Sequence, residues 1–207
     1  MQMMPIALDI ETSGTNFLKC GIWQIGAIDL NTMEEFLEEG RIDDDDEILN
    51  MLGDSKPVLE VIGKTEEELR DKNKQSQKEL LEKFFKWVEG RKMKTFLCQN
   101  PVFDMGIINI RANKYGLNIP FHFRSFDLHS IAQLKYYDLN KNFLMEEDHS
   151  GMGLKNALIF CGMDDKRGAH NALEDCKLTA ECFSRIVDGE NLFPEYSGFE
   201  IPEVLKK

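Results

Sequence analysis

The segment PIALDIE, from Pro5 to Glu11, limits the fold more than any other stretch of this chain. It is short and apolar, which is typical of a central strand, and a turn-like stretch, TSGTN, follows it. Asp9 and Glu11 are two residues apart, so on a strand both carboxylates point to one face, near the end where an open α/β sheet meets its ligand. A charge beside apolar residues is costly without a partner cation. The pair therefore indicates a cation site, with a strand end that meets solvent as the alternative.

Two further strands are expected directly after the first one. Residues 21–30 (GIWQIGAIDL) and 33–42 (MEEFLEEGRI) both have strand character, and the pair Asn31-Thr32 joins them. The three segments together suggest an antiparallel meander. Residues 43–69 carry mixed signals, which we interpret as short helices with loops.

Helices and strands alternate in the second half of the chain. Apolar positions at helical spacing indicate an amphipathic helix over residues 76–88, and KTFLCQN at 94–100 is typical of a buried strand. Asn100 then takes the N-cap position of a helix, with Pro101 as its first residue and Gly116 as its stop. Further elements are expected as a strand over PFHFRSF at 120–126 and as helices at about 127–136 and 153–161.

The last helix is the most clearly marked. Asn171 and Glu174 have the spacing of a capping box, and apolar residues then recur at three- and four-residue intervals up to Val187. This places His170 just before the helix and Asp175 in its first turns. Three strands followed by alternating strands and helices predict an α/β architecture with a mixed sheet.

Length and composition fit a single globular domain. The chain has 207 residues, of which 42% are hydrophobic and 30% charged, and it shows no repeat, linker or composition break. We therefore expect one domain over residues 1–207, with a core at about 5–188 and an extended tail at 189–207. We expect the tail to wrap the domain surface, and the docking of a partner is the alternative.

The sequence also predicts where such a protein works. No apolar run approaches the roughly 18 to 20 residues that span a bilayer, and the first residues do not resemble a signal peptide, so we expect a cytoplasmic protein without a membrane partner. The five cysteines form no Cys-x-x-Cys pair. They are therefore expected to be free, buried thiols rather than disulfides or zinc ligands.

The charge of the chain is unevenly distributed. The net charge of −12 argues against a nucleic-acid partner, because phosphate binding uses lysine and arginine. Residues 91–137, however, contain seven basic and only two acidic residues. One face of the protein could therefore attract phosphate, although solvated faces of different charge are an equally good interpretation.

Three other polar residues each have an ordinary explanation when taken alone. Asp104 and Asp175 lie near the starts of helices, where a carboxylate is favourable for electrostatic reasons. His170, one of four histidines, stands in a turn, where a histidine is more often a cap or a surface residue than a base.

Taken in order, these residues resemble the three motifs of the DEDDh (DnaQ-like) exonucleases. The motifs are LDIETSG at the end of the first strand, NPVFD at a strand-to-helix turn and HNALEDCKLTAE at the last helix. The resemblance covers roughly residues 6–187 and implies a ribonuclease H-like fold, with an antiparallel meander plus parallel strands flanked by helices. Two departures are Gln99, where many members have histidine, and Pro101 after the asparagine; neither removes a ligand.

The resemblance also implies a two-metal mechanism with two Mg²⁺ or Mn²⁺ ions held by carboxylates. Asp9 would bridge both ions, Glu11 and Asp175 would complete the shell of the first, and Asp104 would hold the second. His170 would take the proton from the attacking water, which suits its ordinary pKa.

The substrate contacts implied by the resemblance are less specific. Thr12 would contact the terminal sugar, and Phe17 or Trp23 would stack on or wedge between the last bases, although a core position is the favoured interpretation for both aromatic residues. Asn100 would orient the turn or touch the phosphate, which is compatible with a role as N-cap.

The function that the resemblance implies is a metal-dependent 3′-to-5′ exonuclease. It would act on the 3′ ends of single-stranded DNA or RNA and release nucleoside 5′-monophosphates. An exoribonuclease or small-oligonucleotide hydrolase is the alternative within the class, since no residue settles recognition of the 2′-hydroxyl. A non-catalytic nucleic-acid-binding module is less favoured, because all five positions are kept. A separate polymerase chain and a homodimer both stay open as assemblies.

Overall fold

A five-stranded sheet with the order β3-β2-β1-β4-β5 forms the centre of the computed structural model, which describes residues 3–49, 57–166 and 171–207. The strands are β1 (Ile6–Thr12), β2 (Ile22–Asp29), β3 (Glu34–Glu39), β4 (Phe96–Cys98) and β5 (Phe126–Asp127). β1, β2 and β3 pair antiparallel, whereas β4 runs parallel to both β1 and β5. The structure thus confirms the predicted mixed sheet, a meander extended by parallel strands.

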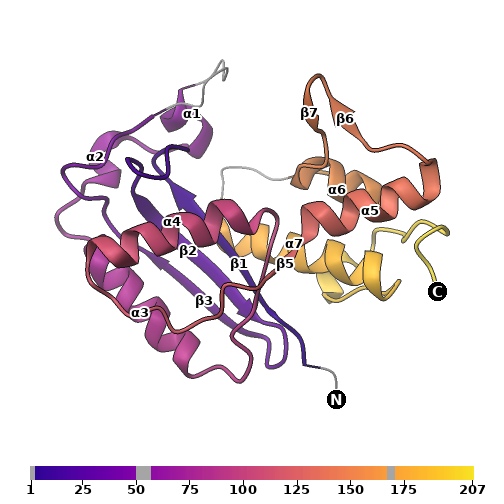
Figure 1. The fold of residues 1–207 in the computed structure, drawn as a ribbon, viewed down its shortest axis with the longest axis horizontal. Coiled ribbons are helices and arrows are strands. Elements are labelled where there is room, and N and C mark those ends of the chain that lie inside the picture. The colour runs from indigo at the N-terminus through magenta and orange to yellow at the C-terminus, as the bar shows by residue number, and fades with distance from the viewer. Residues whose placement is uncertain (1–2, 50–56, 167–170) are drawn as a thin grey trace.

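Helices cover both faces of this sheet (Figure 1). They are α1 (Val58–Ile62), α2 (Glu66–Leu69), α3 (Gln77–Glu89), α4 (Pro101–Lys114), α5 (Leu128–Asn140), α6 (Leu154–Phe160) and α7 (Ala172–Val187). A small hairpin of β6 (Met145–Glu146) and β7 (His149–Ser150) follows α5, and a 3-10 turn spans Pro194–Tyr196. In the described ranges, no helix combines the length and the apolar character that crossing a membrane requires.

Alternation along β1 decides which side of the sheet the carboxylates face. Leu8 and Ile10 point into the core that α3 and α4 cover, whereas Ala7 points into the core formed with α5, α6 and α7. Because successive strand residues face opposite sides, Asp9 and Glu11 lie on the side of Ala7. The two carboxylates therefore face α7.

The loop before β5 differs from the predicted strand over residues 120–126. Only Phe126 of this segment belongs to β5. The backbone N–H of Arg124 donates to Nδ1 of His122, 3.2 Å away, so a side chain takes the place of a sheet partner. The prediction was wrong here because a pattern of aromatic residues does not reveal this local turn.

The C-terminal tail lies against α7 and is held by a buried ion pair. Arg185 Nε and Glu181 Oε1 are 2.8 Å apart, and both side chains are fully buried. The second oxygen of Glu181 accepts from the backbone N–H groups of Leu192 and Phe193, each at 2.9 Å. Leu205, near the end of the tail, is also buried. The tail is therefore packed as part of the folded unit.

Candidate active site

Three carboxylates from β1 and α7 come together at one end of the sheet. Asp9, Glu11 and Asp175 each offer an oxygen atom, and these atoms all lie within 4.8 Å of one another. Glu11 and Asp175 are buried, each with 6% of its surface exposed, and Asp9 is half-buried. Like charges this close repel one another, so the carboxylate cluster (Asp9, Glu11 and Asp175) favours the binding of a cation or of protons.

Gly26 of β2 allows α7 to reach this cluster. It is the register partner of Asp9, and a Cβ atom at Gly26 would lie 2.3 Å from the carbonyl carbon of Ala172 and 2.4 Å from the nitrogen of Leu173. The first turn of α7 therefore rests directly on the backbone of β2. Only glycine leaves room for this approach.

Gln24 fixes the same turn of α7 from the neighbouring register position. Its Oε1 accepts from the backbone N–H of Ala172 at 2.8 Å, and the side chain is buried. Gln24 pairs with Glu11 across the two strands. Sequence reasoning missed Gln24 and Gly26, although both lie within the strand predicted at 21–30, because their importance depends on where α7 packs.

Asn171 starts α7 and so determines where Asp175 lies. Its side-chain Oδ1 accepts from the backbone N–H groups of Leu173 and Glu174, each at 3.1 Å. The predicted cap therefore forms, but the Glu174 side chain makes no reciprocal bond to the Asn171 backbone, so the capping box is incomplete. His170, the proposed base, lies outside the described residues.

Asp104 of α4 contacts β1 between the two carboxylates of that strand. Its Oδ1 accepts from the backbone N–H of Ile10 at 3.2 Å, between Asp9 and Glu11, at a point where β4 has already ended. Asp104 is not one of the three carboxylates within 4.8 Å. Burial raises the pKa of its carboxyl group to about 7, although hydrogen bonds from Ile10 and from its own backbone counteract part of this effect.

Two thiols lie near the carboxylates, one in each of the two cores of the sheet. Cys98 at the end of β4 and Cys176 in α7 are both fully buried, and Cys176 Sγ lies 3.1 Å from the carbonyl oxygen of Gly26. Burial raises the pKa of both thiols well above the usual range, and nearby carboxylates such as Asp9 and Asp104 add to this. Both groups are therefore neutral thiols, which are poor metal ligands. All five cysteines are free and buried, as predicted.

The residues suggested as substrate contacts have different surroundings. The Thr12 hydroxyl donates to the carbonyl of Gly14 at 2.6 Å. Phe17 is half-buried and packs edge-on against Phe103 of α4, with ring centroids 5.5 Å apart. Asn100 is exposed at the start of α4, and its side chain makes no capping bond. Asn100 is thus exposed to a substrate, whereas Thr12 is buried, with 8% of its surface exposed.

Trp23 lies in the core rather than on the surface. Only 1% of its area is exposed, and it packs in a small cluster with Ile42, Ile62 and Leu69. The ring has no open face on which a nucleic-acid base could stack. The structure thus supports the core interpretation for Trp23.

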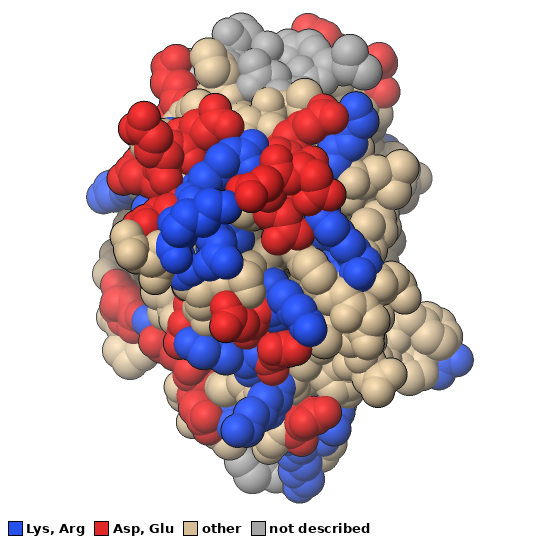
Figure 2. Space-filling model, turned by 90° about the vertical axis from the view of Figure 1, so that its left-hand side faces the viewer, with Lys and Arg blue, Asp and Glu red and all other residues tan. Residues whose placement is uncertain are grey.

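The basic residues of segment 91–137 do not form one open positive face. Arg111 Nη1 is 2.6 Å from Asp46 Oδ1 in a buried ion pair, and Lys114 Nζ is 2.8 Å from Asp43. Arg91 pairs with Glu34. On the face drawn in Figure 2, lysines and arginines accordingly lie among acidic residues. Charge summed along the sequence overestimated the positive potential because these partners are far away in the chain.

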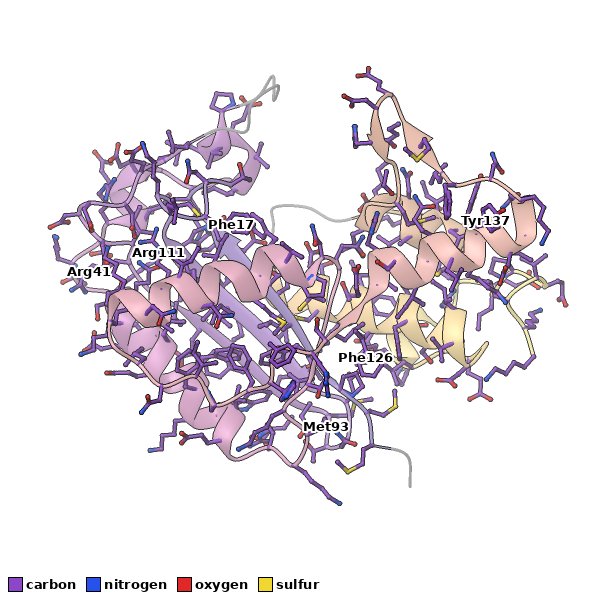
Figure 3. All side chains as sticks on the ribbon, in the orientation of Figure 1. Phe17, Arg41, Met93, Arg111, Phe126 and Tyr137 are labelled. Atoms are coloured by element: carbon purple, nitrogen blue, oxygen red, sulfur yellow. The ribbon has the colours of Figure 1, made fainter. Side chains whose placement is uncertain are left out.

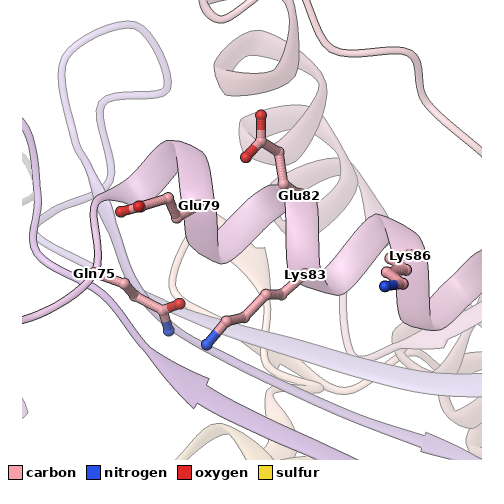
Figure 4. A pocket seen from close by; sticks show the side chains of 5 residues that line it. All are labelled: Gln75, Glu79, Glu82, Lys83 and Lys86. Carbon is pink, nitrogen blue, oxygen red and sulfur yellow. The ribbon is translucent and has the colours of Figure 1, made fainter.

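Two other places on the protein carry acidic side chains. Asp43, Asp45 and Asp46 also gather within 4.8 Å, but Lys114 lies within 4.0 Å of each of them. A shallow hollow of about 410 Å³ over α3 contains Glu79, which already accepts from the Ser76 backbone (Figure 4). The acids at both places therefore have a cation or a helix cap as partner.

Solved structures of exonucleases share this fold. The nuclease domain of 3′hExo, a DEDDh family member bound to rAMP, matches at 20% identity and a TM-score of 0.60, with 96% of this chain and 95% of that chain covered. Cell-death related nuclease 4 matches at 16% identity and a TM-score of 0.64, covering 90% and 64%. E. coli Exonuclease I in complex with a dT13 oligonucleotide matches at 18% and 0.61, covering 89% and 41%. The mixed sheet therefore has the ribonuclease H-like fold of these nucleases.

A family model identifies the chain more closely. Residues 4–187 match the 3′-5′ exoribonuclease Rv2179c-like domain, and the chain belongs to this family. A comparison with curated proteins found no match. The family and the resemblance to DEDDh exonucleases that the motifs predicted therefore agree.

Proposed function

We propose that this protein is a metal-dependent 3′-to-5′ exonuclease that removes nucleoside 5′-monophosphates from single-stranded RNA. One observation carries the proposal: Asp9, Glu11 and Asp175 hold three carboxylate oxygens within 4.8 Å of one another, in a family of exoribonucleases. DNA is the second candidate substrate, because E. coli Exonuclease I, which shares the fold, was solved with a dT13 oligonucleotide. The catalytic unit proposed is residues 5–188, with the tail at 189–207 packed on it.

The donor set fits two hard divalent cations. The cluster offers only carboxylate oxygens among its described side chains, and the nearby thiols of Cys98 and Cys176 are kept neutral by burial. Mg²⁺ and Mn²⁺ prefer such oxygen donors. Asp9, Glu11, Asp175 and Asp104 would hold the ions. When bound, these ions supply activation of water and relief of negative charge at the phosphate.

The residues of the chain would divide the remaining work. The reaction adds water to phosphorus, breaks the bond to the 3′ oxygen of the preceding nucleotide and leaves that oxygen as a hydroxyl. From its place directly before Asn171, we propose that His170 accepts the proton of the attacking water. Asn100, exposed at the start of α4, would contact the phosphate, and Thr12 would contact the terminal sugar once its hydroxyl leaves the Gly14 carbonyl.

Labelled oligomers test this function. RNA and DNA 12-mers, labelled at the 3′ or the 5′ end, are incubated with Mg²⁺, Mn²⁺ or EDTA. We expect mononucleotide release from 3′ ends only, faster on RNA, and none in EDTA or with Asp9→Ala. Release from 5′ ends, internal cleavage, or the absence of any product with both metals would contradict the proposal.

A further inference from the structure

An exposed aromatic residue stands beside unpaired cations at the end of the sheet opposite the carboxylate cluster. Phe123, in the loop between α4 and β5, has 79% of its surface exposed. Its ring stacks on that of His122, with centroids 4.4 Å apart and planes 29° apart, and the guanidinium of Arg124 lies 5.6 Å from its centroid. Two rings therefore already stack at the surface with a guanidinium nearby, and all three are groups that stack on or attract further aromatic rings.

Two lysines belong to the segment before β4, which lies next to this loop. The backbone N–H of His122 donates to the carbonyl of Lys94 at 3.3 Å, so the loop lies beside the segment that leads into β4. Within the part of the chain that the structure describes, Lys92, Lys94 and Arg124 have no carboxylate partner within 4.0 Å, unlike Arg111 and Lys114. In a protein of net charge −12, this surface therefore combines cations without a carboxylate partner with an exposed aromatic ring.

The strands connect this surface to the carboxylate cluster. β4 and β5 run parallel, and Cys98 is paired with Asp127 at their ends, next to the turn that carries Asn100. Phe126 lies between the two places; 43% of it is exposed, and its ring packs edge-on against Phe183. In Figure 3, Met93 lies at the lower end of the molecule and Phe126 above it. Phe126 is thus a second exposed ring, between Phe123 and the carboxylate cluster.

We propose that the aromatic–basic surface (His122, Phe123, Arg124, Lys92 and Lys94) binds single-stranded nucleic acid upstream of the 3′ end. The inference rests on the proposed function. Stacking on rings together with backbone contacts to cations is how proteins hold single strands without reading their sequence. The six steps along the chain from Lys94 to Asn100 span about 20 Å at a rise of about 3.3 Å per residue. A stacked strand at about 3.4 Å per nucleotide covers this distance with about six nucleotides.

Substrates of two lengths distinguish an effect on this surface from an effect on the catalytic centre. For a trimer, which occupies only the catalytic end, Phe123→Ala should leave kcat and KM unchanged. For a 12-mer, the same substitution should raise KM roughly tenfold with kcat unchanged, since one stacking contact is lost. Phe143→Ala, which removes another exposed ring from a different part of the molecule, is the matched control and should change neither substrate.

Binding without turnover gives the second readout. Fluorescence anisotropy with a labelled 12-mer in EDTA should show weaker binding for Phe123→Ala, and the triple change of Lys92, Lys94 and Arg124 to Gln should reduce the slope of log K against log salt by about 2. Equal binding by wild type and variants, or equal effects on trimer and 12-mer, overturns the inference. If wild type hydrolyses neither oligomer, the proposed function fails, and the anisotropy alone then decides about this surface.

Discussion

The close approach of α7 to the backbone of β2 at Gly26 supports a specific prediction. In Gly26→Ala the new Cβ would lie 2.3 Å from the carbonyl carbon of Ala172, whereas an ordinary contact begins near 3.4 Å. The first turn of α7, and Asp175 with it, must therefore move by about 1 Å. A shift of this size in a catalytic group can cost about 100-fold in rate. Overpacking of this kind also typically destabilises a protein by about 1–3 kcal/mol.

Two assays separate the local effect from general unfolding. The rise in melting temperature on adding Mg²⁺ should be much smaller in Gly26→Ala than in wild type, and kcat should fall about 100-fold at a temperature where both proteins are folded. Gly198→Ala is the control, because nothing lies within 4 Å of its added Cβ atom. If Gly26→Ala keeps the metal response and a kcat within twofold of wild type, the idea that glycine positions Asp175 is wrong.

Three further predictions concern buried charges. Arg111→Met should lower the free energy of unfolding by about 3 kcal/mol in chemical denaturation, because it removes the buried cation of Asp46 and leaves only Lys114, 3.7 Å away. Arg185→Met should also lower the free energy of unfolding, because it leaves Glu181 buried without its cation. The same change should make the C-terminal tail sensitive to limited proteolysis. In EDTA, Asp104 should destabilise the protein as pH rises. Its pKa of about 7 exceeds the unfolded value, so the native state keeps a proton that the unfolded state loses between about pH 4 and 7. Asp104→Asn should abolish this decrease in stability.

Each of these predictions has its own control. Lys72→Met, which breaks an exposed pair with Asp44, should leave the free energy of unfolding close to that of wild type. An Arg111→Met effect no larger than that of Lys72→Met would show that the buried pair is not important for stability. A tail that resists protease in Arg185→Met would contradict its anchoring by that residue. If wild type and Asp104→Asn show the same slope of stability against pH in EDTA, the carboxyl group is not protonated in the native state.

Local patterns in the sequence predicted most of the fold. Asp9 and Glu11 could be placed on one face because strand alternation depends only on residue spacing. The start of α7 could be placed because Asn171 is a strong N-cap, and its cap bonds do form. Residues 120–125 were misassigned, since the bond between Arg124 and the His122 ring is a local turn that periodicity does not reveal.

Features that depend on distant parts of the chain could not be predicted. Gly26 is important because α7, which lies about 150 residues later in the chain, packs against it. The residues around Gly26 do not predict this contact. The pair Arg111–Asp46 neutralises charge that a count over residues 91–137 leaves positive. Trp23 could be a base-stacking ring or a core residue by sequence, and only the packing of residues from α1, α2 and the neighbouring loop around it decides.

The rate of RNA hydrolysis by variants in which one carboxylate is replaced tests the central claim most directly. The claim is that Asp9, Glu11 and Asp175 form the active site, whereas the second acidic group around Asp45 does not. With a 3′-labelled RNA 12-mer and Mg²⁺, Asp175→Asn should release mononucleotides at least about 100-fold more slowly than wild type, and Asp45→Asn should match wild type. An Asp175→Asn variant with near-normal rates, or an Asp45→Asn variant that is inactive though folded, would contradict the assignment.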